Sequence, residues 1–449
     1  MDAALLVKGG NLVIPEVGVM EGSIAIDGGK IVGIYQKEHL PRGKQEIDAT
    51  GLYIFPGVIQ PHAHLGRGDT MADLTTETRS ATIGGVTTCL IYHRGLDFED
   101  SLKKATLLSH IDFSFHLQIM DEEQLNKIPH YVNAVGITSF KFNMGYKGEE
   151  AKDKDLKELN DGLMYEGFKK IATFPGAIAC IHAENSEIIA YQTAKLRGSV
   201  DDLAAWSASR PDYAEAEAIN RALFFSELTG CPLYIVHMTT ALGLKVINEY
   251  RKKGKTKVYI ETCPQYLTHH EGSPSGRKGK FIPPLRKRED NDALWKGINK
   301  GEIDTIGIDQ VMRQVEEEEI SIWQRKTSPR EAVTALPLLI TEGFIKRGLP
   351  LRDIAKLTAL NPAMIFGLYP RKGTIMVGSD ADLVLVDLHK EKTVTKELLQ
   401  SQSNFSLYEG WKLKGWPLIT ISRGRIIMEN HVPLGEPGWG MFLSRQIPK

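Results

Sequence analysis

Residues 57–65 read GVIQPHAHL, an apolar run that ends on two histidines. Seven more β-rich apolar runs follow it, and helical stretches separate them. One of these, 215-EAEAINRALFFSELTG, has its apolar residues at helical spacing and ends on a glycine. The eight runs are 57-GVIQPHAHL, 86-VTTCLIYH, 113-FSFHLQIM, 139-SFKFNM, 177-AIACIHAEN, 233-LYIVHMT, 258-VYIETCPQY and 305-TIGIDQV. This alternation predicts an α/β fold, a (β/α)8 TIM barrel whose active site lies at the C-terminal ends of the strands.

Both ends of the chain have a different pattern. Residues 1–55 and 373–428 consist of short alternating apolar runs punctuated by turn residues such as Gly-Gly and Asp-Gly, which is typical of β-hairpins. We expect one small β-sandwich assembled from both termini, because two separate units of about 55 residues would each bury little core. The predicted domains are residues 1–55 and 371–449 for the sandwich and its tail, and 56–370 for the barrel.

Composition limits the classes of partner. The 449 residues carry 55 Lys and Arg against 56 Asp and Glu, for a net charge of −1, so no global field favours nucleic acid or an anionic membrane. No apolar run reaches the roughly 18–20 residues that span a bilayer, and the N-terminus lacks a secretion-signal pattern. Four cysteines stand far apart without a CxxC motif, which fits a reducing cytoplasm.

Residues able to bind metal gather where the barrel would place its active site. His62 and His64 are two residues apart at the end of the first run, so both side chains leave the same face of a strand. Four more such residues lie in or after other runs: Lys141, His182, His237 and Asp309. One alone would be read as a hydrogen-bonded strand residue, but five strands that deliver ligands to one end predict a metal centre. The remaining candidates are read as core or loop residues: His93, His116, His269 and His270.

The chain resembles the cyclic amidohydrolases of the dihydropyrimidinase and hydantoinase family over nearly its whole length. The matching segments are PHAHL, GGVTT, SFKFNMGYK, HAEN, VHMTTA, ETCPQYLT, IPPLR, NPA, IFGLYPRKGTI, VGSDADLVLVD and EGWKLKGWP. The resemblance implies that Lys141 is N6-carboxylated and bridges two divalent metal ions, usually zinc. It implies further that His62, His64 and Asp309 bind one ion, and that His182 and His237 bind the other.

The same resemblance implies hydrolysis of the C–N bond in a cyclic amide, imide or ureide such as a hydantoin or dihydropyrimidine. Asp309 would take a proton from the attacking water and pass it to the departing nitrogen. Tyr146 would donate a hydrogen bond to the developing oxyanion, although it could also be an aromatic packed on a loop. The family resemblance implies a homo-oligomer, a tetramer. The apolar C-terminal tail around Trp439 and Phe442 fits either an interface or docking on its own subunit.

Three departures from the family pattern concern the surroundings of the metals and the ring. Gln60 replaces an aspartate before the histidine pair, Gln310 replaces a histidine after Asp309, and Ile282 replaces a serine whose main chain contacts the substrate. The asparagine that holds the cyclic imide is absent around Arg325, Lys326 and Thr327. The predicted substrate contacts are Tyr146, Ile282, Arg325 and Lys326. Cations in this region, with Arg313 and Arg67, would favour a ring with an acidic substituent, unless they only balance the charges of residues 316–319.

Rival functions fit less well. A dihydroorotase would carry an arginine two residues after His64, where this chain has Gly66 and places Arg67 one position later. Allantoinase ranks between that activity and hydantoinase. A non-enzymatic scaffold relative would have lost metal ligands, and all six positions are retained here. A deaminase on a similar barrel would not need a bridging lysine.

Overall fold

The computed structural model describes residues 2–36, 40–66, 70–95, 97–153, 156–198, 200–315 and 320–445. Its centre is a sheet of eight parallel strands in sequential order, which confirms the predicted barrel. Each predicted apolar run overlaps one of these strands. The strands are β6 (Val58–Ala63), β7 (Val86–His93), β8 (Asp112–Gln118), β9 (Ser139–Asn143), β10 (Ile178–His182), β11 (Leu233–Ile235), β12 (Val258–Thr262) and β13 (Thr305–Ile306).

The barrel closes between its first and last strands through a few specific contacts. The side-chain Oε1 of Gln60 accepts hydrogen bonds from the backbone N–H groups of His62 and Ile308, at 3.2 and 3.1 Å. Beyond the strand ends, the backbone N–H of His64 donates to Gln310 and the N–H of Gln310 donates to His62. Two of the three positions that depart from the family pattern, Gln60 and Gln310, therefore join the strands that carry the predicted ligands.

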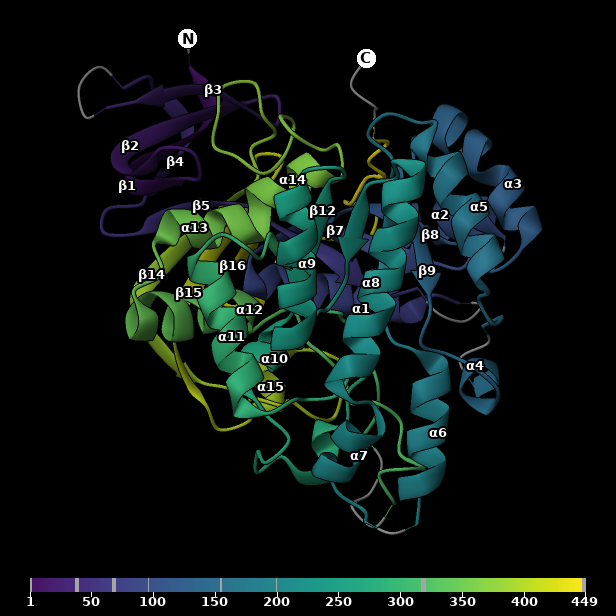
Figure 1. The fold of residues 1–449 in the computed structure, drawn as a ribbon. Coiled ribbons are helices and arrows are strands. Elements are labelled where there is room, and N and C mark those ends of the chain that lie inside the picture. The colour runs from purple at the N-terminus through teal and green to yellow at the C-terminus, as the bar shows by residue number, and fades with distance from the viewer. Residues whose placement is uncertain are drawn as a thin grey trace.

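Helices surround the barrel (Figure 1). The longest described helix, α8, ends at Thr229. Gly230 follows with a left-handed φ of 75°, which agrees with the prediction that this helix ends on a glycine. No helix in the described ranges has the length and apolar character required to cross a bilayer. The helices are α1 (Ala72–Ala81), α2 (Phe98–Leu108), α3 (Glu122–His130), α4 (Glu149–Asp153), α5 (Asp161–Ala172), α6 (Ser186–Leu196), α7 (Leu203–Ser209), α8 (Asp212–Thr229), α9 (Ala241–Lys253), α10 (Pro264–Thr268), α11 (Arg288–Asn299), α12 (Ala335–Leu338), α13 (Leu351–Ala355), α14 (Asn361–Ile365) and α15 (Lys396–Leu399).

A second, mostly antiparallel sheet of nine strands is assembled from both ends of the chain, as predicted, and lies to one side of the barrel (Figure 1). The pairing of β5 with β14 joins the N-terminal strands to the C-terminal ones. Apolar side chains from both ends pack together into one buried cluster beside it. The strands are β1 (Ala3–Ile14), β2 (Gly18–Asp27), β3 (Lys30–Tyr35), β4 (Gly43–Asp48), β5 (Tyr53–Pro56), β14 (Leu383–Thr393), β15 (Lys412–Ser422), β16 (Arg425–Glu429) and β17 (Val432–Pro433).

The C-terminal tail docks on its own barrel. Phe442 forms a parallel bridge with Phe113 of β8, and their rings lie 6.0 Å apart. Leu443 is fully buried, and the buried guanidinium of Arg445 donates to Ser139 at 2.6 Å. The apolar residues at this end are thus largely covered within one chain, so the tail does not itself call for a partner subunit.

Candidate metal centre

The ends of β6 and β13 bring three predicted ligands to one point. The Oδ1 atom of Asp309 lies 3.2 Å from His62 Nε2 and 3.1 Å from His64 Nε2, and the two Nε2 atoms are 3.2 Å apart. Together the three residues form a group able to hold one metal ion. The backbone contacts that close the barrel at Gln310 explain why residues far apart in the sequence meet here.

A second imidazole pair lies beside the first group. His182 Nδ1 and His237 Nε2, from the ends of β10 and β11, are 2.9 Å apart. The ring of His237 stacks near that of His62, with 5.4 Å between centroids. Burial lowers the pKa of both His182 and His237, which keeps these imidazoles in the neutral form that binds metal.

Buried carboxylates hold the outer nitrogens of two of these rings. Glu261 on β12 accepts from His62 Nδ1 at 2.6 Å, and Glu184 accepts from His182 Nε2 at 2.7 Å. Arg210 contacts both oxygens of Glu184, at 3.1 and 3.2 Å. A proton held toward each carboxylate leaves the lone pair of the opposite nitrogen directed at the centre, the usual arrangement around metal-binding histidines.

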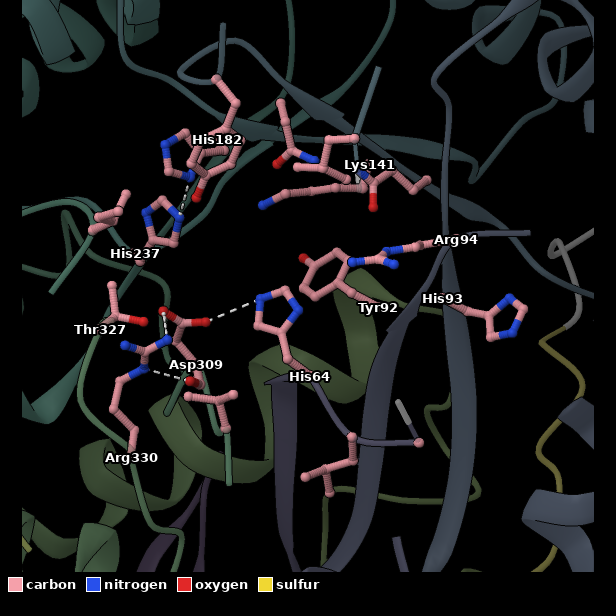
Figure 2. Close-up of a pocket in the computed structure, with 18 of the residues that line it drawn as sticks. His64, Tyr92, His93, Arg94, Lys141, His182, His237, Asp309, Thr327 and Arg330 are labelled. Atoms are coloured by element: carbon pink, nitrogen blue, oxygen red, sulfur yellow. Dashed lines mark hydrogen bonds and ion pairs between the residues drawn. The ribbon is translucent and has the colours of Figure 1, made fainter. Parts of the chain in front are cut away.

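Lys141, on β9, extends toward the same space (Figure 2). Its side chain is buried, and its Nζ has no hydrogen-bond partner among the described residues. The Nζ lies 4.7 Å from the centroid of the Tyr92 ring, and burial lowers the pKa of Lys141 to about 8. An amine that is desolvated and unpaired is costly to keep in a core, so Lys141 fits a role in which its nitrogen is modified.

Arg330 holds the other side of Asp309 (Figure 2). Its Nη2 lies 2.9 Å from Asp309 Oδ2, and its Nε donates to the Asp309 carbonyl at 2.5 Å. Burial raises the pKa of Asp309, but Arg330 and the two histidines outweigh it and hold the pKa well below its usual range. Asp309 also has a left-handed φ of 55°, a conformation that needs support in a residue other than glycine.

These groups open into a pocket of about 390 Å³. The ring of Tyr146 lies 4.9 Å from that of His182, and Ile282 forms part of the wall. Burial and Glu150 raise the pKa of Tyr146, against a lowering by Arg210, so its hydroxyl remains a hydrogen-bond donor. His93 also lines the pocket, whereas His116 and His269 are buried away from it.

Two predicted substrate contacts lie elsewhere. Arg325 and Lys326 line a neighbouring cavity, and neither borders the pocket of the predicted ligands. Arg313 borders both spaces. Arg67 and residues 316–319 lie outside the described residues.

Sequence reasoning did not assign four residues that shape the site. Glu184 lies within the HAEN segment and Glu261 within ETCPQYLT, and a glutamate near the end of a barrel strand is the signal that identifies both. Tyr92, under Lys141 and edge-on to His62, lies one residue before the end of β7. Arg330 has no comparable signal, because it lies in an irregular segment that reaches Asp309 only in three dimensions.

Comparison with known proteins agrees with this geometry. A model of the amidohydrolase family matches residues 53–427. The D-hydantoinase of Geobacillus stearothermophilus is 32% identical, over 98% of this chain and 96% of its own length. The L-hydantoinase of Paenarthrobacter aurescens is 32% identical, over 98% of each chain. The crystal structure of dihydropyrimidinase from Brevibacillus agri aligns with a TM-score of 0.89 at 30% identity, over 98% of each chain. The chain therefore belongs to the amidohydrolase family, as a cyclic amidohydrolase related over nearly its whole length to hydantoinases and dihydropyrimidinases.

Proposed function

We propose that this enzyme opens a hydantoin-like or dihydropyrimidine-like ring by hydrolysing its amide C–N bond with two divalent metal ions, which we expect to be zinc. The observation that carries the proposal is the placement of Lys141. Its buried and unpaired Nζ belongs to the same pocket as the His62–His64–Asp309 group and the His182–His237 pair.

The donor set fits such a centre. His62, His64 and Asp309 would hold one ion, and His182 and His237 the other, with N6-carboxylated Lys141 as the shared ligand. Carboxylation replaces a cationic amine, a poor ligand, with an anion that offers two oxygens. When bound, such ions would supply Lewis acidity and would lower the pKa of water from 15.7 toward about 7.

The chain's own residues account for the proton transfers and for orientation. Asp309 takes a proton from the water that attacks the ring carbonyl carbon, and returns it to the nitrogen as the C–N bond breaks. Tyr146 donates a hydrogen bond to the oxygen that becomes negative. Arg330 keeps the Asp309 carboxylate turned toward His62 and His64.

We further propose a cytoplasmic location and a homotetrameric assembly. The four cysteines are buried and free, which suits a reducing cytoplasm. The C-terminal tail docks within one chain and so gives no support for an interface. The homotetramer is therefore proposed from the family resemblance alone. A monomer in light scattering at micromolar concentration would reject the tetramer.

Ring opening of a panel tests the proposed activity. Hydantoin, dihydrouracil and allantoin are incubated with the protein, and loss of the ring is followed by chromatography. We expect turnover of at least one ring, loss of turnover after chelation, and its return with zinc. An enzyme with two bound metals that opens none of these rings or their substituted analogues would contradict the proposal.

A further inference from the structure

One buried guanidinium contacts two carboxylates that belong to different parts of the site. Arg210 lies between the end of α7 and the start of α8. Its Nε and Nη2 atoms contact Glu184 at 3.1 and 3.2 Å, and its Nη1 atom lies 3.2 Å from each carboxylate oxygen of Glu150. Each carboxylate therefore occupies its own edge of one planar group, a geometry that a lysine cannot reproduce.

The first carboxylate supports a predicted metal ligand. Glu184 is fully buried and accepts a hydrogen bond from His182 Nε2 at 2.7 Å. A buried carboxylate is costly to keep charged unless a cation is paired with it, and Arg210 supplies that charge. Without Arg210, Glu184 would be driven toward its protonated form and would hold the His182 proton less strongly. Loss of Arg210 should therefore weaken metal binding by His182.

The second carboxylate belongs to the segment that carries Tyr146. Glu150 lies on α4, four residues beyond Tyr146, and its side chain is 30% exposed. On the other side of Tyr146, the backbone N–H of Met144 donates to the carbonyl of His182 at 3.0 Å. Tyr146 therefore lies between two attachments, one to β10 and the other to Arg210.

The same segment passes closely over the His182–Glu184 pair at Gly145. A Cβ atom at this position would lie 2.7 Å from His182 Nε2 and 3.1 Å from the Cβ of Glu184. Glycine gives the backbone room for such an approach. The next residue is Tyr146, whose ring lies 4.9 Å from that of His182. A shift of the segment would therefore move Tyr146 relative to the predicted metal ligands.

We propose that Arg210 is a positioning residue that fixes His182 and Tyr146 relative to each other. Through Glu184 it orients the imidazole of His182. Through Glu150 it holds the segment that carries Tyr146. Arg210 does not border the pocket of the predicted ligands, so it acts through these carboxylates and not on the substrate. This inference rests on the proposed function, because it assigns the support of two groups that act in ring opening.

A double-mutant cycle tests the link to Tyr146. Glu150→Gln keeps the size of the side chain and removes the charge that Arg210 contacts. On a ring that the wild type opens, we expect kcat to fall about tenfold, less than the roughly 100- to 1,000-fold cost of losing an oxyanion donor, with KM and zinc content unchanged. In a Tyr146→Phe background the same change should cost less than about twofold, because the group that it positions is already gone. Equal losses in the two backgrounds would overturn the inference.

A chelator titration tests the link to His182 without any substrate. Each zinc-loaded protein is titrated with chelator, and the zinc that stays bound is measured. We expect Arg210→Gln to bind zinc about 10- to 100-fold more weakly than the wild type, the usual cost of disturbing the group behind a metal-binding histidine. Arg210→Lys should recover part of this loss, and Glu150→Gln should retain zinc as the wild type does. Equal zinc affinity in Arg210→Gln and the wild type would overturn the inference.

Two control variants measure the effect of losing an ion pair elsewhere. Arg251→Gln removes an arginine that pairs with Asp304, directly before β13 and so at the end of the barrel opposite the site. Glu227→Gln removes a glutamate of α8 that pairs with Lys255 and is 23% exposed, close to the exposure of Glu150. Neither variant should change kcat or zinc affinity.

The two readouts also separate this inference from the proposed function. If Arg210→Gln does not fold, Glu150→Gln still decides the inference, because its side chain is partly exposed and its loss leaves Arg210 paired with Glu184. A wild type that opens no ring would count against the proposed function, and the zinc titration would then decide the inference by itself.

Discussion

The guanidinium of Arg330 holds Asp309 from the side opposite the histidines. Nη2 contacts Oδ2 at 2.9 Å and Nε donates to the Asp309 carbonyl, so Oδ1 alone faces His62 and His64. The contact fixes both the carboxylate and the backbone of a residue with a left-handed φ of 55°. Arg330 is thus a positioning residue for the proposed proton carrier.

Replacing Arg330 should impair turnover more than metal binding. We expect Arg330→Gln to lower kcat about 100-fold, since small misplacements of reacting groups cost on this order. Arg330→Lys should recover part of the loss, because lysine restores the positive charge but cannot make both guanidinium contacts to Asp309. Kinetics with metal analysis checks this, and Arg352→Gln, at an exposed position of α13, is the control. Near-normal kcat in Arg330→Gln would show that Asp309 does not need the contact.

Glu261 should support metal affinity through His62. Loss of a carboxylate behind a metal-binding histidine typically weakens binding about 10- to 100-fold, so we expect Glu261→Gln to lose metal at lower chelator concentration. Glu249→Gln, at an exposed position of α9, is the matched control. If the two variants retained metal equally under chelator titration, Glu261 would have no such role.

Tyr146 should act in the transition state. Removing one donor to an oxyanion usually costs about 100- to 1,000-fold in kcat, and we expect that loss in Tyr146→Phe. Steady-state kinetics separates kcat from KM, and Tyr191→Phe, with Tyr191 72% exposed, is the control. A variant in which only KM rises would place Tyr146 in ground-state binding.

Acid should destabilise the fold partly through His269. Its ring stacks on Trp411, and burial lowers its pKa to about 4, aided by His270 and opposed by Glu342. Between pH 6.5 and 4 the unfolded chain binds a proton that the folded protein does not, so stability falls as pH falls through this window. The slope is at most about 1.4 kcal/mol per pH unit.

Denaturant unfolding at several pH values measures this dependence. We expect a flatter curve in His269→Gln than in the wild type, and no flattening in His389→Gln, whose histidine is exposed on β14. Parallel curves for the wild type and His269→Gln would rule out His269 as a source of acid sensitivity.

The sequence predicts the barrel well because its strands are buried apolar runs, and the segments between them have apolar residues at helical spacing. It also predicts the cluster of His62, His64 and Asp309, since barrel strands deliver side chains to one end. It does not predict Arg330, whose partner lies 21 residues earlier and is reached by an irregular segment. Nor does it predict that Arg325 and Lys326 border a second cavity, because the path of that segment depends on packing.

Metal reconstitution tests the central claim most directly. The enzyme is stripped with chelator in carbon-dioxide-free buffer, then given zinc with or without bicarbonate, and metal content and ring opening are measured together. We predict that the wild type binds about two metal equivalents per chain and regains full activity only when zinc and bicarbonate are both added. We predict that Lys141→Ala regains neither the two metal equivalents nor the activity. Full activity in metal-free protein, or reconstitution of Lys141→Ala to the wild-type level, would contradict a two-metal centre bridged by carboxylated Lys141.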